Sequence, residues 1–278
     1  MPDAEQKQDE GAELEPSEQG DVEEHRQLKA LVIYEVVRRE GDDELSRPTS
    51  SLWWSGLTAG LGMGFSLAAE GALHAGLPDA PWRPLVENFG YTVGFLIVIL
   101  SRHQLFTENT LTAVLPVLHP PMGHKIGDML RLWTVVFIAN LVGTALFAAV
   151  ICAGPVVAEH LRAGIIEVAR ELGQKSASEV FWRAIPAGWL IATLVWMLPS
   201  AETGRIWVII AITYLIALFE LTHVIAGAAE VFLLVYIGDI GLLDAGLHFL
   251  GPMLVGNVIG GSALFAMLSF GQVKEEIG

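Results

Sequence analysis

The chain has 278 residues, of which 53 % are hydrophobic and 17 % charged, with a formal net charge of −15 at pH 7. This composition and a mean hydropathy of +0.50 exclude an ordinary soluble domain and favour a membrane protein. The single cysteine, Cys152, excludes an intrachain disulfide.

The negative charge is concentrated at the N-terminus, where residues 1–25 set many acidic side chains against a single lysine, Lys7. Such a segment buries too little apolar surface to fold, so we predict a disordered acidic cytoplasmic tail over residues 1–26. It lacks the basic start and apolar core of a signal peptide. Residues 27–48 mix apolar and charged side chains, which predicts an amphipathic, juxtamembrane helix on the membrane surface.

Six apolar stretches follow, each near or above the ~20 residues that cross a bilayer. We place these spans near residues 52–76, 84–117, 129–152, 180–198, 206–237 and 243–270. They predict a transmembrane domain over residues 49–272, with repeat one at 49–152, repeat two at 179–272, and a cytoplasmic tail at 273–278. Because each repeat has three spans, the second enters the membrane inverted relative to the first.

A sequence pattern repeats between the two halves and supports this division. Asn140-Leu-Val-Gly143 in the third span returns as Asn257-Val-Ile-Gly260 in the sixth span. The glycines are expected to let neighbouring helices pack closely.

The second and fifth spans are too long for one crossing, and polar residues interrupt both. The run at 101–110 predicts a half-helix, an internal loop around 102–108 and a second half-helix whose first turn Thr107 or Asn109 caps. The alternative is an ordinary loop between two short spans, which would give seven crossings. The fifth span is interrupted at 220–223. Paired interruptions of this kind indicate broken helices that frame a substrate path.

His223 lies in the second interruption, opposite Thr107 in the repeat. A histidine can change its charge near neutral pH, so a His bonded to a Thr hydroxyl can pass a proton to a weak-acid anion or simply orient the anion. Two other acidic residues in the spans are interpreted as structural. Glu70 is expected to face a subunit interface or to pair with a basic group, and Glu230 to reach the membrane interface or to pair.

Basic residues in the connecting segments predict which side each terminus faces. With the N-terminus inside, the cytoplasmic segments carry Arg38, Arg39, Arg47, Lys125, Arg131, Arg205 and Lys274. Both termini are therefore expected in the cytoplasm.

At these residues the chain resembles the formate/nitrite transporter family. The motifs are a Leu-Phe-Thr loop (Leu105-Phe106-Thr107), a His followed by Val-Ile-Ala in the fifth helix (His223 to Ala226), and the two Asn-x-x-Gly pairs. The fourth helix adds Phe-x-Arg-x-Ile, here Phe181 to Ile185. The resemblance covers about residues 48–272 and marks the chain as a divergent branch.

The resemblance implies an all-α membrane protein with an aquaporin-like fold, assembled as a homopentamer in a bacterial-type inner membrane. It implies transport of small monovalent anions (formate, nitrite, hydrosulfide or short carboxylates) and protons, with no cofactor, metal, nucleic acid or enzymatic activity. His223 would be the central histidine and Thr107 its partner. The residues expected along the substrate path with them are Leu105, Phe106, Phe95, Tyr91, Ile216, Thr222 and the anion-attracting Lys175.

Three positions depart from the family pattern, at Gly188, Thr222 and Gly227. These departures leave a second hypothesis open, in which the fold is retained for another small solute or for a sensor or scaffold role without transport. Two mechanisms also remain open for the anion. In one, His223 passes it a proton; in the other, a charged His223 and the half-helix N-termini hold the ion throughout.

Overall fold

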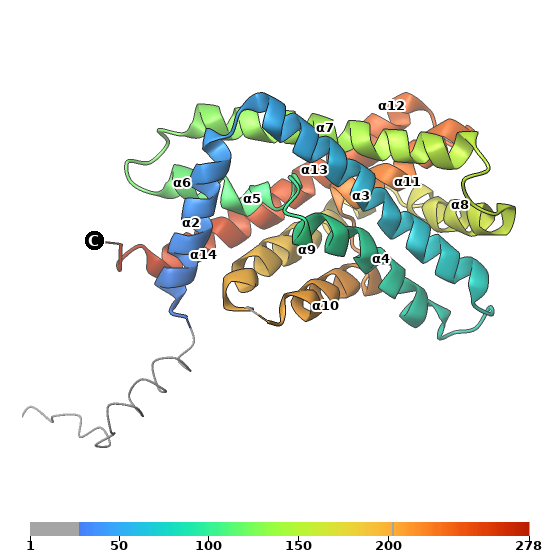
Figure 1. Cartoon of the computed structure of the whole chain (residues 1–278), viewed down its shortest axis with the longest axis horizontal. Coiled ribbons are helices and arrows are strands. Elements are labelled where there is room, and N and C mark those ends of the chain that lie inside the picture. Colours follow the sequence, from blue (N-terminus) through green and yellow to red (C-terminus); the bar gives the residue numbers. More distant parts are fainter. Residues whose placement is uncertain (1–27, 202, 278) are drawn as a thin grey trace, which may run out of the picture.

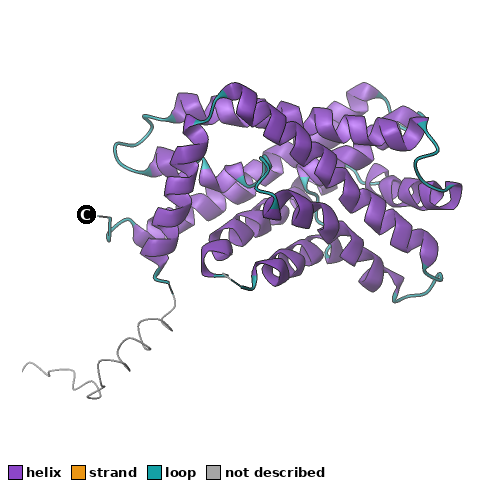
Figure 2. Cartoon of the chain, viewed as in Figure 1, coloured by secondary structure: helices purple, strands orange, loops and turns teal. Residues whose placement is uncertain are grey.

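The computed structural model describes residues 28–201 and 203–277, and these residues form helices joined by turns and loops, with no β-strand among them (Figure 2). The predicted tail over residues 1–26 lies outside the described residues. The helices, in chain order, are α2 (Ala30–Ser46), α3 (Thr49–Gly76), α4 (Arg83–Leu100), α5 (Asn109–Thr112), α6 (Leu115–Leu118), α7 (Ile126–Ala153), α8 (Glu159–Gly173), α9 (Ala177–Met197), α10 (Arg205–Leu218), α11 (Val224–Ile237), α12 (Leu242–Asp244), α13 (Gly251–Val258) and α14 (Met267–Val273) (Figure 1).

The expected arrangement of two groups of three spans is confirmed. Repeat one contains α3, the broken span α4–α5–α6, and α7. Repeat two contains α9, the broken span α10–α11, and the continuous helical segment from α12 to α14. In the part of the chain that the structure describes, four helical segments are long and apolar enough to cross a membrane: 83–100, 126–153, 177–200 and 242–273. The seven-span alternative is wrong, because residues 104–107 of the loop between α4 and α5 are buried inside the protein.

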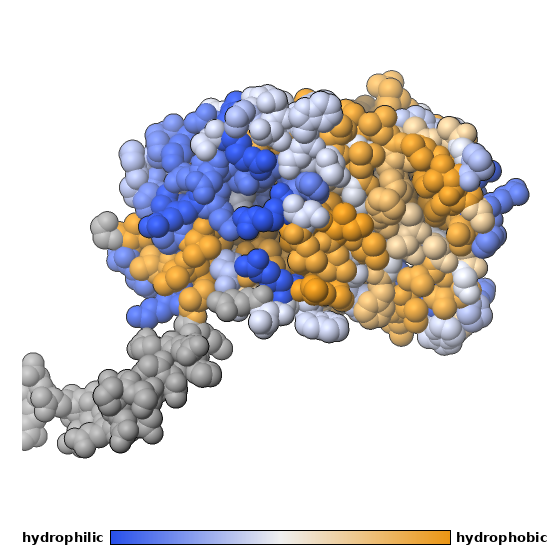
Figure 3. Space-filling view, viewed as in Figure 1, coloured by the Kyte–Doolittle hydropathy of each residue, from blue (hydrophilic) through white to orange (hydrophobic). Residues whose placement is uncertain are grey.

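The outside of the molecule is apolar over much of its length. Figure 3 shows a broad hydrophobic area over the centre and right of the view, and polar residues gathered at the left, where Figure 1 places α2. Large apolar side chains that face outward include Phe65, Ile97, Ile138 and Leu146. An apolar exterior of this extent is what a lipid-embedded helical protein presents.

The amphipathic character of α2 reflects packing against the protein. Its buried side, which includes Tyr34, Val37 and Leu45, contacts α5, α6, α7 and α14. At Gly41 the backbone approaches so closely that an added Cβ atom would lie 1.9 Å from the carbonyl oxygen of Thr112. Some of the apolar residues that suggested a membrane-surface helix therefore pack against the second half of the first broken span.

Helix α8 forms most of the connection between the two repeats. Its buried residues recur with helical spacing, at Ile165, Val168 and Leu172, and the helix packs on α3 and α11. The connection is thus an amphipathic helix that covers one end of the bundle.

Both broken spans end their first half in the same way. Arg102 and Glu220, which follow α4 and α10, have positive φ angles of 55° and 49°, a left-handed conformation that is uncommon for residues other than glycine. The next residues, His103 and Leu221, donate their backbone N–H groups to carbonyl oxygens five positions earlier. These bonds complete a Schellman-type helix end and turn the chain inward at equivalent places in the two repeats.

The two repeated asparagines hold the two breaks in place. Asn140 Oδ1 accepts from the Phe106 N–H at 2.9 Å, and Asn140 Nδ2 donates to the carbonyls of Gly56 and Gln104. Asn257 makes the equivalent bonds in repeat two: its Oδ1 accepts from the Val224 N–H at 2.8 Å, and its Nδ2 donates to the carbonyls of Ala184 and Thr222. Each amide thereby satisfies backbone groups that the broken helix leaves without helical partners.

Close helix packing accompanies these asparagines in both repeats. A Cβ atom added at Gly188 would lie 2.2 Å from the Asn257 carbonyl oxygen, and one at Gly60 would lie 2.2 Å from the Asn140 carbonyl oxygen. Gly188, a departure from the family pattern, is therefore where α9 contacts α13.

Candidate functional site

The loop of the first broken span meets the start of α11 in the interior. Thr107 Oγ1 lies 2.6 Å from His223 Nε2, and both side chains are almost fully buried. The structure thus brings the two polar interruptions of the sequence into direct contact, although they are far apart along the chain. It differs at one point, because the Thr107 hydroxyl bonds His223 and no side chain caps the start of α5.

The hydrogen bond made by the second ring nitrogen of His223 determines the tautomer of this histidine. His223 is the N-cap of α11, and its Nδ1 accepts the backbone N–H of Ala226 at 3.1 Å. Because a backbone N–H can only donate, Nδ1 carries no hydrogen in this arrangement. The ring is therefore neutral, with its hydrogen on Nε2, which donates to Thr107 Oγ1. The Thr107 hydroxyl keeps its own hydrogen for another acceptor.

Three buried apolar residues, Phe95, Leu105 and Ile216, belong to one hydrophobic cluster, have no exposed surface and are here called the barrier. The Phe95 ring meets the His223 ring edge-on at 5.0 Å between centroids. The Phe106 ring packs edge-on against Trp133 and Phe137 of α7.

A chamber opens on each side of the barrier. The Arg102 chamber, of about 220 Å³, is lined at α4 by Ile99 and lies near α2. The His223 chamber, of about 340 Å³, is lined at α4 by Tyr91 and lies near α8. Phe95 is four residues from each of these two, on the same side of α4, so its ring lies between the chambers.

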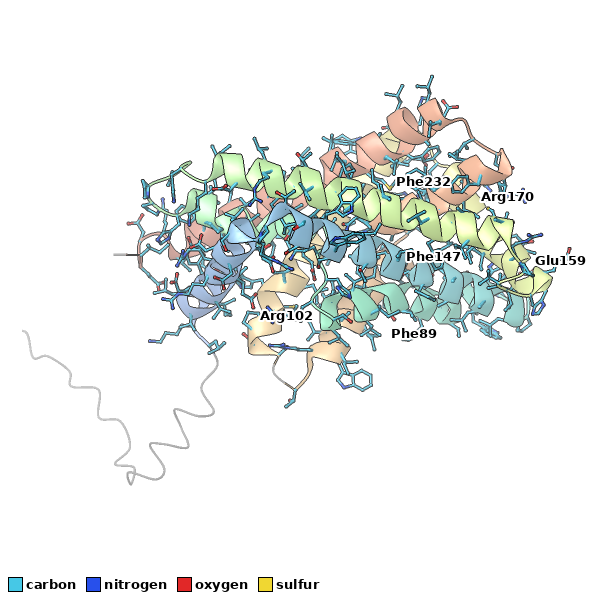
Figure 4. All side chains as sticks on the ribbon, turned by 45° about the horizontal axis from the view of Figure 1, so that its top comes forward. Phe89, Arg102, Phe147, Glu159, Arg170 and Phe232 are labelled. Atoms are coloured by element: carbon cyan, nitrogen blue, oxygen red, sulfur yellow. The ribbon has the colours of Figure 1, made fainter. Side chains whose placement is uncertain are left out.

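The side chains that line the Arg102 chamber are mostly polar. They include Glu40, Glu44, Arg102, His103, Gln104, Glu108 and Arg205. Arg102, labelled in Figure 4, lies 3.4 Å from Glu40 of α2 and is largely exposed. Glu44 pairs with Arg47 at 2.9 Å. This chamber therefore carries both signs of charge.

The expected anion-attracting residue, Lys175, does line the His223 chamber, together with Thr222 and His223. Its ammonium group lies 3.6 Å from the Glu220 carboxylate, which Arg183 also contacts at 2.8 Å. The Thr222 hydroxyl donates to the Val180 carbonyl. The charge of Lys175 is thus partly offset, and its attraction for an anion is weaker than that of a free lysine.

Sequence reasoning missed the acidic character of this chamber. Glu70, Glu87, Glu171, Glu220 and Glu230 all line it. Partial burial raises the pKa of the Glu171 carboxyl on α8, and the neighbouring Glu87 raises it further. The embedded carboxylates at 70 and 230 were visible in the sequence, but only the helix orientation shows that they face a cavity. Among the described residues, no group of three or more His, Cys, Asp or Glu side chains is arranged to hold a metal ion.

Comparison with known proteins places this site in a family. A family model described as "Formate/nitrite transporter" matches residues 31–271. The inner membrane protein YfdC of Escherichia coli is 42 % identical over 249 residues, which cover 90 % of this chain and 80 % of YfdC. A probable formate transporter of Methanothermobacter thermautotrophicus is 26 % identical, covering 71 % of this chain and 78 % of the relative. A solved pentameric formate channel with formate bound shares the fold, with a TM-score of 0.73 and 19 % identity over 82 % of this chain and 98 % of that one.

Proposed function

The chain belongs to the formate/nitrite transporter family, and from this premise we propose that it conducts small monovalent anions past His223, between its two chambers. Membership makes it a multi-pass protein of the bacterial inner membrane and a channel or transporter, not an enzyme. Formate is the first candidate because one relative is a probable formate transporter and the solved channel contains formate. Nitrite, hydrosulfide and short carboxylates share its size and charge. By the same likeness, five copies would assemble with one path in each.

The contact between Thr107 and His223 carries this proposal. An anion that leaves water needs hydrogen-bond donors in place of its hydration shell. Without such donors, the desolvation free energy of the anion is on the order of several kcal/mol or more. The His223 Nε2–H and the Thr107 hydroxyl are donors that meet at the barrier formed by Phe95, Leu105 and Ile216. With both termini in the cytoplasm, the Arg102 chamber opens inward and the His223 chamber outward.

The cap on α11 sets a condition for proton coupling. A neutral His223 has no proton to spare, so it must first gain one at Nδ1, which displaces the Ala226 N–H. It can then transfer its Nε2 proton to the anion, which crosses as a neutral acid and leaves the ring protonated at Nδ1. The alternative expected from the sequence was a channel in which a charged His223 and the half-helix N-termini hold the anion. Because the ring that caps α11 is neutral, in a channel without proton transfer the Nε2–H and the Thr107 hydroxyl would hold the anion, and the cap would stay intact.

Replacing His223 by phenylalanine tests the proposal. We expect His223→Phe to abolish formate uptake into proteoliposomes at acidic pH, because the ring donor at the barrier is lost while its volume is retained. Thr107→Ser, which keeps a hydroxyl, serves as the conservative control and should still conduct. Formate uptake by His223→Phe equal to that of the unaltered protein would reject the role of the histidine.

One observation favours the second hypothesis, retention of the fold for another small solute. The His223 chamber is lined by five glutamates and one lysine, which is an unfavourable entrance for an anion. Uptake of a neutral solute of formate's size, with no uptake of any small anion at either acidic or neutral pH, would support this second function.

A further inference from the structure

The His223 chamber contains carboxylates that the proposed anion path does not use. Two of its glutamates are engaged, because Glu87 contacts His74 at 3.0 Å and Glu220 contacts Arg183. The other three differ. Within residues 28–201 and 203–277, the side chains of Glu70, Glu171 and Glu230 form no ion pair and no hydrogen bond.

Two uncharged side chains in the same chamber also lack partners. Asn88 and Tyr91 are 9 % and 7 % exposed, they line the cavity, and their side chains make no hydrogen bond to the described part of the chain. Among the described residues, every side-chain polar atom that is completely enclosed has a hydrogen-bond partner. The unbonded amide of Asn88 and phenol of Tyr91 are therefore not completely enclosed, and both residues line the cavity. Buried polar groups are normally hydrogen-bonded, and these two are therefore poised for a ligand.

The chemistry of these groups selects the kind of ligand. Carboxyl, amide and phenol oxygens can all accept hydrogen bonds from a ligand, and a carboxyl group that ionises beside a bound cation adds electrostatic attraction. The Tyr91 ring, next to Phe95 at 5.3 Å between centroids, adds an aromatic surface of the kind that attracts cations. A bare metal ion fits less well, because no metal-holding group of side chains is found in the described residues and the chamber of about 340 Å³ is far larger than such an ion.

We propose that the His223 chamber is a binding site for a small organic cation with N–H donors, of the alkylammonium or guanidinium class, held by Glu70 and Glu230 with Asn88 and Tyr91. These four residues come from three helices, α3, α4 and α11, so the site depends on the folded chain. The inference does not require anion conduction. A cation bound there would also reduce the repulsion that an anion meets on its way to His223.

Direct binding tests the proposal. Full-length protein in lipid nanodiscs is equilibrated by dialysis with radiolabelled methylammonium or guanidinium at neutral pH, with sodium as a competitor. We expect saturable binding of at least one organic cation that equimolar sodium does not displace. Glu70→Gln and Glu230→Gln, which keep the side-chain shape, should each weaken binding about tenfold or more.

Controls separate a site from general surface charge and from misfolding. Glu40→Gln removes a carboxylate from the Arg102 chamber and should leave binding unchanged. Tyr91→Phe, which removes one oxygen only, should weaken binding less than the glutamine variants. The proposal is overturned if neither cation binds saturably, if sodium displaces both, or if the two glutamine variants bind as the unaltered protein does. Because the readout is binding, failure of anion conduction would leave it standing.

Discussion

Asn140→Leu and Asn257→Leu are each expected to destabilise the protein strongly and to abolish solute flux. Either change leaves a backbone N–H, of Phe106 or of Val224, and a loop carbonyl without their partners in the interior. Each unsatisfied buried group costs about 1–3 kcal/mol, so the two together lower stability by roughly 2–6 kcal/mol. This corresponds to a fall of about 4–24 °C in Tm for a chain of this size, measurable by thermal unfolding in detergent.

The repeat makes this prediction more specific. The two asparagines make equivalent bonds, so their leucine variants should lose similar amounts of stability. Thr58→Val is a matched control on α3, because the Thr58 hydroxyl only bonds Trp54 of its own helix and faces outward. A Tm of either asparagine variant within about 1 °C of that of Thr58→Val would contradict the role of the asparagines in holding the breaks in place. A difference of that size lies within the ordinary spread of surface substitutions.

Phe95→Ala is expected to open the barrier between the two chambers. The Phe95 ring is fully buried between them and contacts His223, so its removal leaves a cavity that links the two spaces. Water and larger solutes should then pass, which stopped-flow light scattering of proteoliposomes would record as faster swelling. The lost packing should also cost about 3–5 kcal/mol of stability.

Phe65→Ala provides the comparison for this variant. Phe65 packs against Phe147 on the outside of α3, away from both chambers. Its loss should leave water permeability unchanged. If Phe95→Ala is folded, as judged by its elution and melting, and its liposomes swell no faster than those of Phe65→Ala, then Phe95 does not close the path.

The sequence predicts the breaks in the second and fifth spans, because polar groups within an apolar span are tolerated only inside the protein or beside a water-filled cavity. Residues 101–110 could not face lipid, and the Asn-x-x-Gly repeat indicated two equivalent halves, so the arrangement of spans followed. The left-handed backbone at Arg102 and Glu220 gave no such signal, because residues other than glycine rarely adopt it.

Other features needed the orientation of helices, which a hydropathy pattern does not supply. Glu70 and Glu230 were interpreted as structural, yet both face the His223 chamber. The connection that becomes α8 is too charged to be recognised as a span, although its apolar residues recur every three or four positions. The hydrogen bond from the Ala226 N–H to His223 Nδ1, which determines the tautomer of His223, depends on where α11 begins.

The central claim is that solute passes through the His223 chamber to the pair formed by His223 and Thr107. A single cysteine at Ala217, which lines that chamber, tests it most directly in a Cys152→Ser background, with Ala163→Cys on the exposed side of α8 as the control. After complete labelling with a bulky membrane-impermeant thiol reagent, formate flux should stop in the Ala217→Cys protein and continue in the control. Undiminished flux through fully labelled Ala217→Cys would contradict the account.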